Sequence, residues 1–291
     1  MAGMNGILLV DKPEGWTSHD VVAKLRGVLG ERRMGHSGTL DPMATGLLMV
    51  FAGRATRAVA FSENHEKCYQ ARLRLGIETD TQDTTGAVLR TCPQQVTRAE
   101  LEAVLPRFRG EIEQLPPMYS AIKVDGQKLY EIARRGGEVE RRPRRICIHD
   151  LTVTGEADGD FLLSVRCSKG TYIRTLCHDI GAALGCGGVM SALRRTAVGT
   201  YRVENAHTMA ELTCLPRAEA QALLLPVDSL FADSAALTIG TKAERLCRCG
   251  NVFPVSAPDG TYRFYSEQGV FLMLGRVTNG QATTIKSFFE V

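Results

Sequence analysis

The sequence predicts an α+β fold with a mixed sheet, followed by a small β-rich module. Strand-like segments outnumber helical ones and alternate with them irregularly, which is typical of α+β domains rather than of regular βαβ repeats. From about residue 235, short strands separated by glycine turns dominate. The chain has 291 residues, 44% of them hydrophobic, enough for one large domain or two modest ones with a substantial core.

The first part of the chain predicts three strands and one helix. Apolar runs at 6–10 and 47–51 favour buried strands. Ser18 is a candidate N-cap, and apolar residues at helical spacing follow it until Gly30 can end the helix. Residues 68–75 alternate between apolar and polar side chains, as expected for a strand with one buried face.

The rest of the chain predicts another helix, a hairpin and the elements of the C-terminal module. Thr97 and Glu100 form a capping box before an apolar helical stretch. Residues 146–154 and 161–167 predict two strands around an Asp-Gly turn. The further predicted elements are helices over 175–184 and 241–249 and strands over 252–255, 262–265 and 270–275.

Composition argues against several classes of protein. No apolar run is long enough to cross a bilayer, and Asp11 and Lys12 come before a signal-like segment could form, so we expect a cytoplasmic protein without an export signal. The nine cysteines are odd in number and irregularly spaced, which favours reduced thiols over disulfides or zinc. The histidines show no spacing that suggests a metal site, so no metal is expected.

Positive charge is concentrated in one segment. The net charge of +3 is by itself weak evidence for a nucleic-acid partner. Residues 117–145, however, contain eight Lys or Arg against four Asp or Glu, with the densest run at 141–145. Tyr119, Tyr130 and a Gly-Gly break lie among these cations, a combination that suits contact with RNA backbone and loops. Composition alone supports RNA contact and an ordinary solvated surface equally.

Residues 35–46, GHSGTLDPMATG, form the most informative segment of the chain. Three glycines, a proline and several hydroxyl residues surround a single carboxylate, Asp41. Glycine admits backbone conformations closed to other residues, and Pro42 restricts Asp41 to an extended backbone. The segment therefore predicts a rigid loop that presents one acid. The alternatives are a turn aspartate that bonds its own backbone and a phosphate loop, but the glycine spacing matches no common phosphate-binding motif.

Five motifs together resemble the TruB family of tRNA pseudouridine synthases. They are VDKPEGWTS at 10–18, GHSGTLDPMATG at 35–46, KCY at 67–69 with LRLG at 73–76, PMYSAIK at 117–123, and SKGTYIRT at 168–175. Their order and spacing are those of the family over nearly the whole chain. The departures are small, since Ser37 replaces the usual threonine and His178 stands where an acid is common.

The resemblance implies a pseudouridine synthase fold with a mixed, mostly antiparallel central sheet over residues 1–234. Residues 117–145 would be an RNA-clamping insertion, and residues 235–291 a small PUA-like β-barrel that binds RNA. The implied activity is isomerisation of the T-loop uridine of tRNA (position 55) to pseudouridine by base flipping, with no cofactor. The implied partner is tRNA, through its T-arm, elbow and acceptor arm, and the implied enzyme is a monomer that needs no protein partner and no membrane.

The resemblance also implies three catalytic residues. Asp41 would be the essential acid. Arg174 would be its partner, because a guanidinium can hold a buried carboxylate through two hydrogen bonds and keep it ionised. Tyr69 would stack on the target base and place its hydroxyl for proton transfer, whereas a tyrosine on a strand is by itself more often a core residue.

Four further residues match positions that contact the substrate in the family. Tyr172 and Leu193 would line the uridine pocket, and His36 would fill the gap left by the flipped base. Lys12 would lie under the active loop, either as a structural residue or near a phosphate. The polar stretch at 79–86 would be a loop beside the site, although a plain polar turn explains it equally well.

The sequence leaves two other functions open. An RNA-folding chaperone on the same scaffold would bind RNA with little or no catalysis, but the presence of Asp41, Tyr69 and Arg174 together argues against an inactive enzyme. A guide-dependent synthase would need protein partners and a guide RNA, and no additional tail or domain for such partners is evident in this sequence.

Overall fold

The computed structural model describes residues 4–289, except residues 121, 125, 134 and 138. Four members of the predicted RNA-clamping insertion therefore lie outside the described residues: Ala121, Asp125, Arg134 and Glu138. The chain divides into two compact units. Unit 1 comprises Met1–Pro42, Leu48–Glu63 and Asn205–Val291, and unit 2 comprises Met43–Leu47 and Asn64–Glu204.

Unit 1 contains the N-terminal elements and the last third of the chain. Before the C-terminal module its elements are β1 (Gly6–Lys12), α1 (Ser18–Leu29), β2 (Met34–Ser37), most of β3 (Thr45–Ala52), η1 (Gly53–Ala58), α2 (Val59–Glu63), β14 (His207–Thr208), α6 (Met209–Cys214), α7 (Arg217–Ala222) and η4 (Val227–Phe231). Short η3 (Val203–Asn205) lies at the boundary between the two units.

The predicted first helix is confirmed, but its N-cap differs. Thr17 rather than Ser18 caps α1, because its side chain accepts from Asp20 N while the Asp20 carboxylate accepts from Thr17 N. The Ser18 hydroxyl is instead buried and hydrogen-bonded to both backbone groups of Leu40. Gly30 ends the helix in the left-handed conformation, as predicted.

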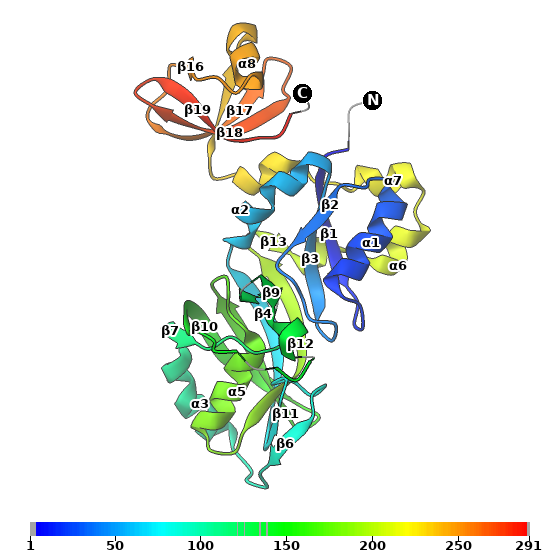
Figure 1. The fold of residues 1–291 in the computed structure, drawn as a ribbon, viewed down its shortest axis with the longest axis vertical. Coiled ribbons are helices and arrows are strands. Elements are labelled where there is room, and N and C mark those ends of the chain that lie inside the picture. Colours follow the sequence, from blue (N-terminus) through cyan, green and yellow to red (C-terminus); the bar gives the residue numbers. More distant parts are fainter. Residues whose placement is uncertain (1–3, 121, 125, 134, 138, 290–291) are drawn as a thin grey trace. The chain divides into compact units, whose positions relative to one another are not determined.

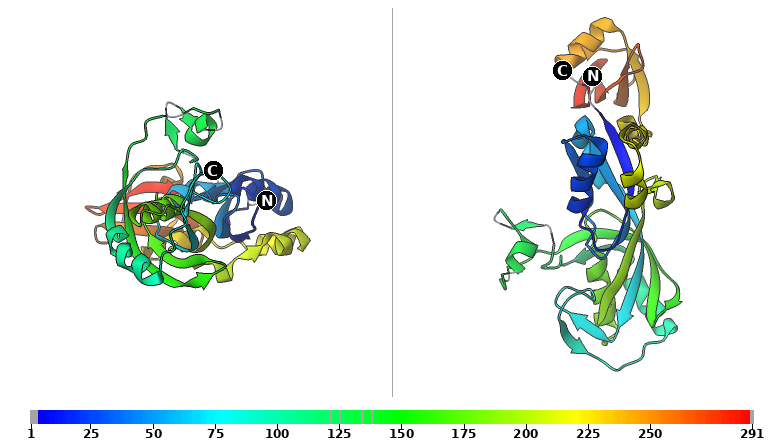
Figure 2. Two further views of the ribbon diagram at one scale, coloured as in Figure 1. Left: turned by 90° about the horizontal axis from the view of Figure 1, so that it is seen from below. Right: turned by 90° about the vertical axis from the view of Figure 1, so that its right-hand side faces the viewer.

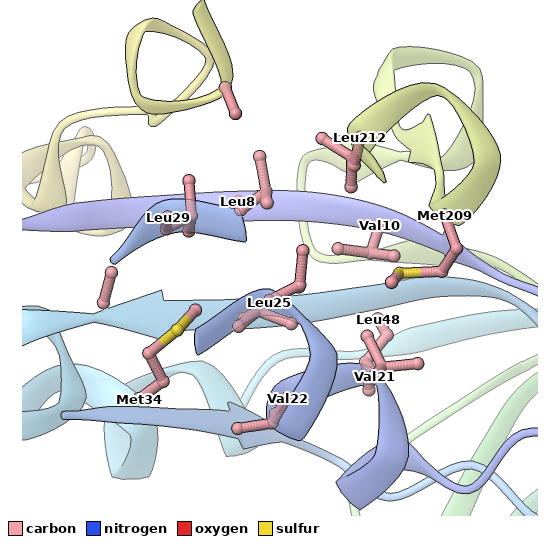
Figure 3. Packing of buried hydrophobic residues seen from close by; sticks show 13 residues of the cluster. Leu8, Val10, Val21, Val22, Leu25, Leu29, Met34, Leu48, Met209 and Leu212 are labelled. Atoms are coloured by element: carbon pink, nitrogen blue, oxygen red, sulfur yellow. The ribbon is translucent and has the colours of Figure 1, made fainter. Parts of the chain in front are cut away.

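An apolar cluster holds the N-terminal part of unit 1 together (Figure 3). The predicted strands at 6–10 and 47–51 are confirmed as β1 and β3, and both contribute to it. One face of α1 and part of α6 cover these strands. The labelled members are Leu8, Val10, Val21, Val22, Leu25, Leu29, Met34, Leu48, Met209 and Leu212.

Unit 2 consists of long antiparallel strands with the helices α3 (Arg98–Val104) and α5 (Ile173–Ala183) on one face (Figure 1). Its elements are β4 (Lys67–Leu75), β5 (Ile77–Thr79), β6 (Val88–Thr91), α3 (Arg98–Val104), η2 (Leu105–Phe108), β7 (Gly110–Gln114), β8 (Lys123–Val124), β9 (Gln127–Lys128), α4 (Leu129–Ala133), β10 (Arg144–Ala157), β11 (Asp160–Cys167), α5 (Ile173–Ala183), β12 (Gly188–Val198) and β13 (Tyr201–Arg202).

Backbone hydrogen bonds join the strands in the order β14-β1-β3-β12-β4-β11-β10-β7, with β2 on β3 and β13 on β12. Most pairs are antiparallel, whereas β1 with β14 and β3 with β12 are parallel. This is the predicted α+β fold with a mixed, mostly antiparallel sheet. The predicted hairpin is β10 and β11, and its turn residues Asp158 and Gly159 both have positive φ.

The C-terminal module is a curved five-stranded sheet with its own apolar core (Figures 1 and 2). Its strands follow the order β15-β17-β18-β19-β16, and α8 packs beside them. This curled half-barrel confirms the predicted small β-rich module and its helix. The bounds are β15 (Ala235–Ile239), α8 (Thr241–Arg248), β16 (Phe253–Pro254), β17 (Gly260–Ser266), β18 (Phe271–Thr278) and β19 (Gln281–Ser287).

The basic segment 117–145 stands out from the sheet of unit 2 (Figure 2). It carries the short strands β8 and β9 and the helix α4 before the chain enters β10. Arg142, Arg144 and Arg145 are exposed. Among the described residues, no helix is both long enough and apolar enough to cross a membrane.

Candidate active site

The Asp41 loop is anchored on its N-terminal side within unit 1. Strand β2 pairs with β3 as far as Ser37, whose buried hydroxyl lies 2.9 Å from that of Ser62. Gly38 then turns the chain with φ +64°. Leu40 is buried and held by the Ser18 hydroxyl, so the chain reaches Asp41 from a fixed point. Asp41 itself is half-buried.

Lys12 lies beneath this loop with its side chain fully buried. Its Nζ donates to the carbonyl oxygens of Pro13 at 2.9 Å, Trp16 at 2.5 Å and Pro42 at 3.2 Å. The Pro42 oxygen also accepts from Gly15 N at 2.8 Å. Bonds to three carbonyls hold the buried ammonium group beneath the loop, and this geometry supports the structural alternative for Lys12.

His36 lies on β2, five residues before Asp41, with its Cα opposite that of Val50. Its ring is half-buried, and Nδ1 has almost no contact with solvent. The β2–β3 pairing therefore fixes the backbone that presents the ring.

The C-terminal side of the loop is anchored within unit 2. Thr45 and Gly46 pair in parallel with Arg194 and Arg195 of β12. A side chain at Gly46 would place its Cβ only 2.3 Å from the Arg195 carbonyl oxygen, so this position requires glycine. The buried Arg195 guanidinium donates through Nε to Leu47 O at 2.7 Å. These contacts fix where the strand after the loop begins.

Tyr69 and Leu193 are neighbours on one face of the unit 2 sheet. Tyr69 lies on β4 opposite Arg195 of β12, and Leu193 lies opposite Ala71. Residues two apart on a strand share a face, so Tyr69 and Leu193 form a diagonal pair. Both are largely buried, at 9% and 8% exposure.

Helix α5 covers the same face and starts with the predicted site residues Tyr172 and Arg174. The helix begins at Ile173, two residues earlier than the sequence predicted. It approaches β12 closely because Gly181 faces Gly188 backbone to backbone. A Cβ at Gly188 would touch Leu73, which shares the buried face of β4 with Tyr69. Unit 2 thus brings Tyr69, Tyr172, Arg174 and Leu193 to one side of its sheet.

The Arg174 guanidinium is buried and held by two other segments of unit 2. Nη1 donates to Thr81 O at 3.1 Å, and Nη2 donates to Tyr119 O at 2.7 Å. Nε lies 3.8 Å from Asp83 Oδ2, and both side chains are more than nine-tenths buried. The guanidinium is therefore fixed in plane and position.

Asp83 organises the polar loop at 79–86, and the sequence did not predict this role. Its Oδ1 accepts from Thr81 Oγ1 at 2.8 Å, Thr85 N at 2.9 Å and Thr85 Oγ1 at 2.5 Å. Thr175 of α5 donates to the Gln82 side chain at 2.8 Å, and Gln82 has φ +63°. The Thr/Asp-rich composition was the available signal, and the contacts with Arg174 and Thr175 support a loop of the site over a plain turn.

The predicted site residues are divided between the two units. Asp41, His36 and Lys12 belong to unit 1, and Tyr69, Tyr172, Arg174 and Leu193 belong to unit 2. The pairing of Asp41 with Arg174 stays a prediction. Nowhere in the described part of the chain do three or more His, Cys, Asp or Glu side chains gather in a way that could hold a metal ion.

Two buried cysteines near this region have unreactive thiols. Burial raises the pKa of Cys177 on α5 and of Cys167 on β11 to about 12. Their thiols stay protonated at neutral pH and do not act as nucleophiles.

Family models match most of the chain. A model described as the TruB family pseudouridylate synthase N-terminal domain matches residues 26–173, and one described as the tRNA pseudouridylate synthase B C-terminal domain matches residues 174–232. The chain belongs to the TruB family. The resemblance of the five sequence motifs is thereby confirmed, and the chain is an enzyme of the isomerase class.

Curated TruB relatives match over most of their own length. The tRNA pseudouridine synthase B of Azoarcus sp. (strain BH72) is 52% identical over 229 residues, which cover 79% of this chain and 76% of that protein. The protein of the same name from Thiobacillus denitrificans is 44% identical over 279 residues, covering 96% and 94%. That of Thermobifida fusca is 46% identical over 271 residues, covering 88% and 92%.

Solved structures share the TruB fold of this chain. The structure titled "Crystal Structure of a Cbf5-Nop10-Gar1 Complex" matches with a TM-score of 0.71 at 25% identity, covering 98% of this chain and 85% of that chain. An H/ACA RNP bound to a substrate RNA containing 2'-deoxyuridine matches with the same TM-score at 24% identity and the same coverage. The shared architecture confirms the predicted pseudouridine synthase fold.

Proposed function

We propose that this chain isomerises the T-loop uridine (position 55) of tRNA to pseudouridine. The observation that carries the proposal is 44% identity to a tRNA pseudouridine synthase B over 96% of the chain, together with the intact Asp41 loop. The reaction breaks the C–N glycosidic bond, turns the base and forms a C–C bond. The base loses the proton on its attacking carbon and gains one on nitrogen, so no redox partner and no cofactor is needed.

Asp41 supplies the essential carboxylate of this reaction. Its loop is fixed by Ser18 and Lys12 on one side and by pairing with β12 on the other. A fixed carboxylate suits either nucleophilic attack or proton removal, because both require reacting atoms held within contact distance. Arg174 is its proposed partner and keeps it ionised at neutral pH through charge-assisted hydrogen bonds.

The remaining site residues receive and hold the flipped base. Tyr69 stacks on the uracil ring and places its hydroxyl for proton transfer, and Tyr172 and Leu193 form the apolar wall. Extruding a base from folded RNA costs a few kcal/mol, and His36 offsets part of this by filling the gap. The common sheet face of Tyr69 and Leu193 supports their assignment to one pocket.

We assign residues 1–234 to the catalytic domain and residues 235–291 to a PUA-like RNA-binding domain. The basic insertion at 117–145 and the C-terminal domain hold the T-arm, elbow and acceptor arm of tRNA. The enzyme works as a cytoplasmic monomer without a protein partner. The exposed arginines at 142, 144 and 145 support backbone contact by the insertion.

The test is pseudouridine formation in an unmodified tRNA transcript, with tRNA binding measured in parallel. Asp41→Asn keeps the shape of the side chain and removes its charge, so we expect modification at the T-loop uridine to be lost while binding survives. Asp158→Asn is the matched control, because this exposed turn carboxylate is replaced by a residue that also tolerates positive φ. Wild-type activity should persist in EDTA if no metal takes part.

The outcomes separate the alternatives. Binding without modification by the wild type would leave the RNA chaperone as the better explanation. Activity that appears only with an added guide RNA and partner proteins would favour a guide-dependent synthase. Modification by Asp41→Asn at the wild-type rate would refute the role of Asp41.

A further inference from the structure

The buried side chain of Gln114 bonds to both backbone groups of Tyr172. Gln114 is the last residue of β7 and is 2% exposed. Its Nε2 donates to Tyr172 O at 3.0 Å, and its Oε1 accepts from Tyr172 N at 2.8 Å. One amide thus forms a two-bond clamp on a residue that lies 58 positions later in the sequence.

This clamp acts where α5 begins. Tyr172 is the N-cap residue of the helix, and no side-chain hydrogen bond caps it. Its carbonyl also accepts the first helical bond, from Leu176 N at 3.0 Å. Gln114 therefore fixes both backbone groups of the N-cap residue from another strand, and its bond from Tyr172 N corresponds to the one that the N3 side chain of a capping box accepts locally. Arg174 follows two residues later, so the clamp sets where its backbone starts.

The segment after Gln114 returns to the same place. Tyr119 O accepts from Arg174 Nη2 at 2.7 Å, five residues after the clamp. Between these points, Pro116 O accepts from Arg141 Nη1 at 3.0 Å. Residues 114–119 thus touch Tyr172 through one end and Arg174 through the other, and the basic insertion begins within them.

We propose that Gln114 is a positioning residue for the isomerisation, which fixes the Tyr172–Arg174 turn so that the Arg174 guanidinium and the Tyr172 ring are held ready for the substrate. This inference rests on the proposed function, because it assumes that both residues serve the pseudouridine reaction. It adds a residue that acts on the site through Tyr172 and Arg174.

Two substitutions separate the hydrogen bonds from the space that Gln114 fills. Gln114→Met keeps the length and removes both bonds. Gln114→Glu reproduces both bonds only when its acid is protonated, since the ionised carboxylate cannot donate to Tyr172 O. Burial raises the pKa of such a carboxyl group, so its protonated fraction grows as the pH falls from about 8 to about 6.

The experiment measures three quantities for wild type, both variants and the control Ile112→Ala. They are the single-turnover rate of pseudouridine formation at saturating enzyme, the dissociation constant for tRNA, and the midpoint of thermal unfolding. Ile112 lies on the same strand, half-buried and paired with Ile146, and monitors loss of packing alone. Amide hydrogen exchange of residues 168–176 gives a fourth readout that does not depend on activity.

We expect Gln114→Met to lower the single-turnover rate roughly ten- to a hundredfold, as a small displacement of reacting groups does, with an unfolding midpoint close to that of Ile112→Ala. The tRNA dissociation constant should change less than about threefold, because both bonds of the clamp go to the backbone of Tyr172 rather than to a side chain. Exchange at 168–176 should accelerate. The rate of Gln114→Glu relative to wild type should rise as the pH falls.

The inference is overturned if Gln114→Met reacts as fast as Ile112→Ala, or if Gln114→Glu shows no gain relative to wild type at low pH. It is also overturned if the defect appears only in tRNA affinity. Failure of the proposed function looks different, because the wild type itself would then form no pseudouridine, while the exchange experiment would still report on the clamp.

Discussion

The role of Arg174 in the site depends on the shape of its guanidinium group as well as on its charge. Its three nitrogens reach Thr81 O, Tyr119 O and the region of Asp83, and these groups come from two loops far apart in the sequence. A planar guanidinium can serve all of them at once, whereas the single nitrogen of lysine cannot. The position therefore requires arginine for geometric reasons.

At the residue scale, we predict that Arg174→Lys lowers the single-turnover rate of pseudouridine formation by about a hundredfold, because the variant lacks the fork that orients the site. Arg166→Lys is the control, since this half-exposed arginine on β11 pairs with Glu66 at 2.9 Å at the surface, where such pairs contribute little. A wild-type rate for Arg174→Lys would show that charge alone suffices.

At the scale of elements, the site depends on how closely α5 approaches β12. A Cβ at Gly181 would lie 2.1 Å from Gly188 N, which is backbone and cannot give way as a flexible side chain can. The two glycines thus set the depth at which the helix lies on the sheet. Arg174 lies in the first turn of the same helix, so its position follows from this contact.

We predict that Gly181→Ala lowers the free energy of unfolding by about 1–3 kcal/mol, as overpacking does, and lowers activity with it. Gly27→Ala is a matched control in α1, where nothing lies within 4 Å of the added methyl group. That change should raise the free energy of unfolding by about 0.5–1 kcal/mol, because alanine favours a helix interior. Urea unfolding measures both, and equal effects would contradict the packing argument.

For the whole molecule, we expect RNA binding to depend more on where the positive charge lies than on the net charge. The chain carries a net charge of only +3, yet the basic segment 117–145 has twice as many cations as acids. Arg142 and Arg145 are exposed, which suits contact with RNA phosphates. Such contacts release counterions, so binding of tRNA should weaken steeply as salt rises.

We predict that Arg142→Gln with Arg145→Gln reduces the slope of log affinity against log salt by up to about two, or about one for each phosphate that an arginine no longer neutralises. Arg90→Gln with Arg98→Gln removes the same charge from surface ion pairs and should leave the slope nearly unchanged. Filter binding at several salt concentrations provides the slopes. An equal reduction in both variants would indicate net charge rather than position.

Local sequence patterns correctly predicted several features of the fold. The capping box at Thr97, the positive φ at Asp158 and Gly159, and the end of α1 at Gly30 all depend on residues within one turn of each other. The alternation in β4 revealed its buried face for the same reason. The local sequence patterns did not predict strands β15 and β19. These segments are strands because of their backbone pairing with neighbouring strands rather than because of their own composition.

The sequence by itself determined the fold class, the family, the Asp41 loop and the residue types of the predicted site, because these depend on local patterns and motif order. The tertiary structure showed that the Ser18 hydroxyl is held by Leu40, 22 residues away, whereas the Thr17–Asp20 capping box that begins α1 is a local pattern. Tertiary structure alone decided that Asp83 and Gln114 hold Arg174 and Tyr172. Those partners lie 58 or more residues apart, and hydrogen bonds across such distances leave no periodic trace in a sequence.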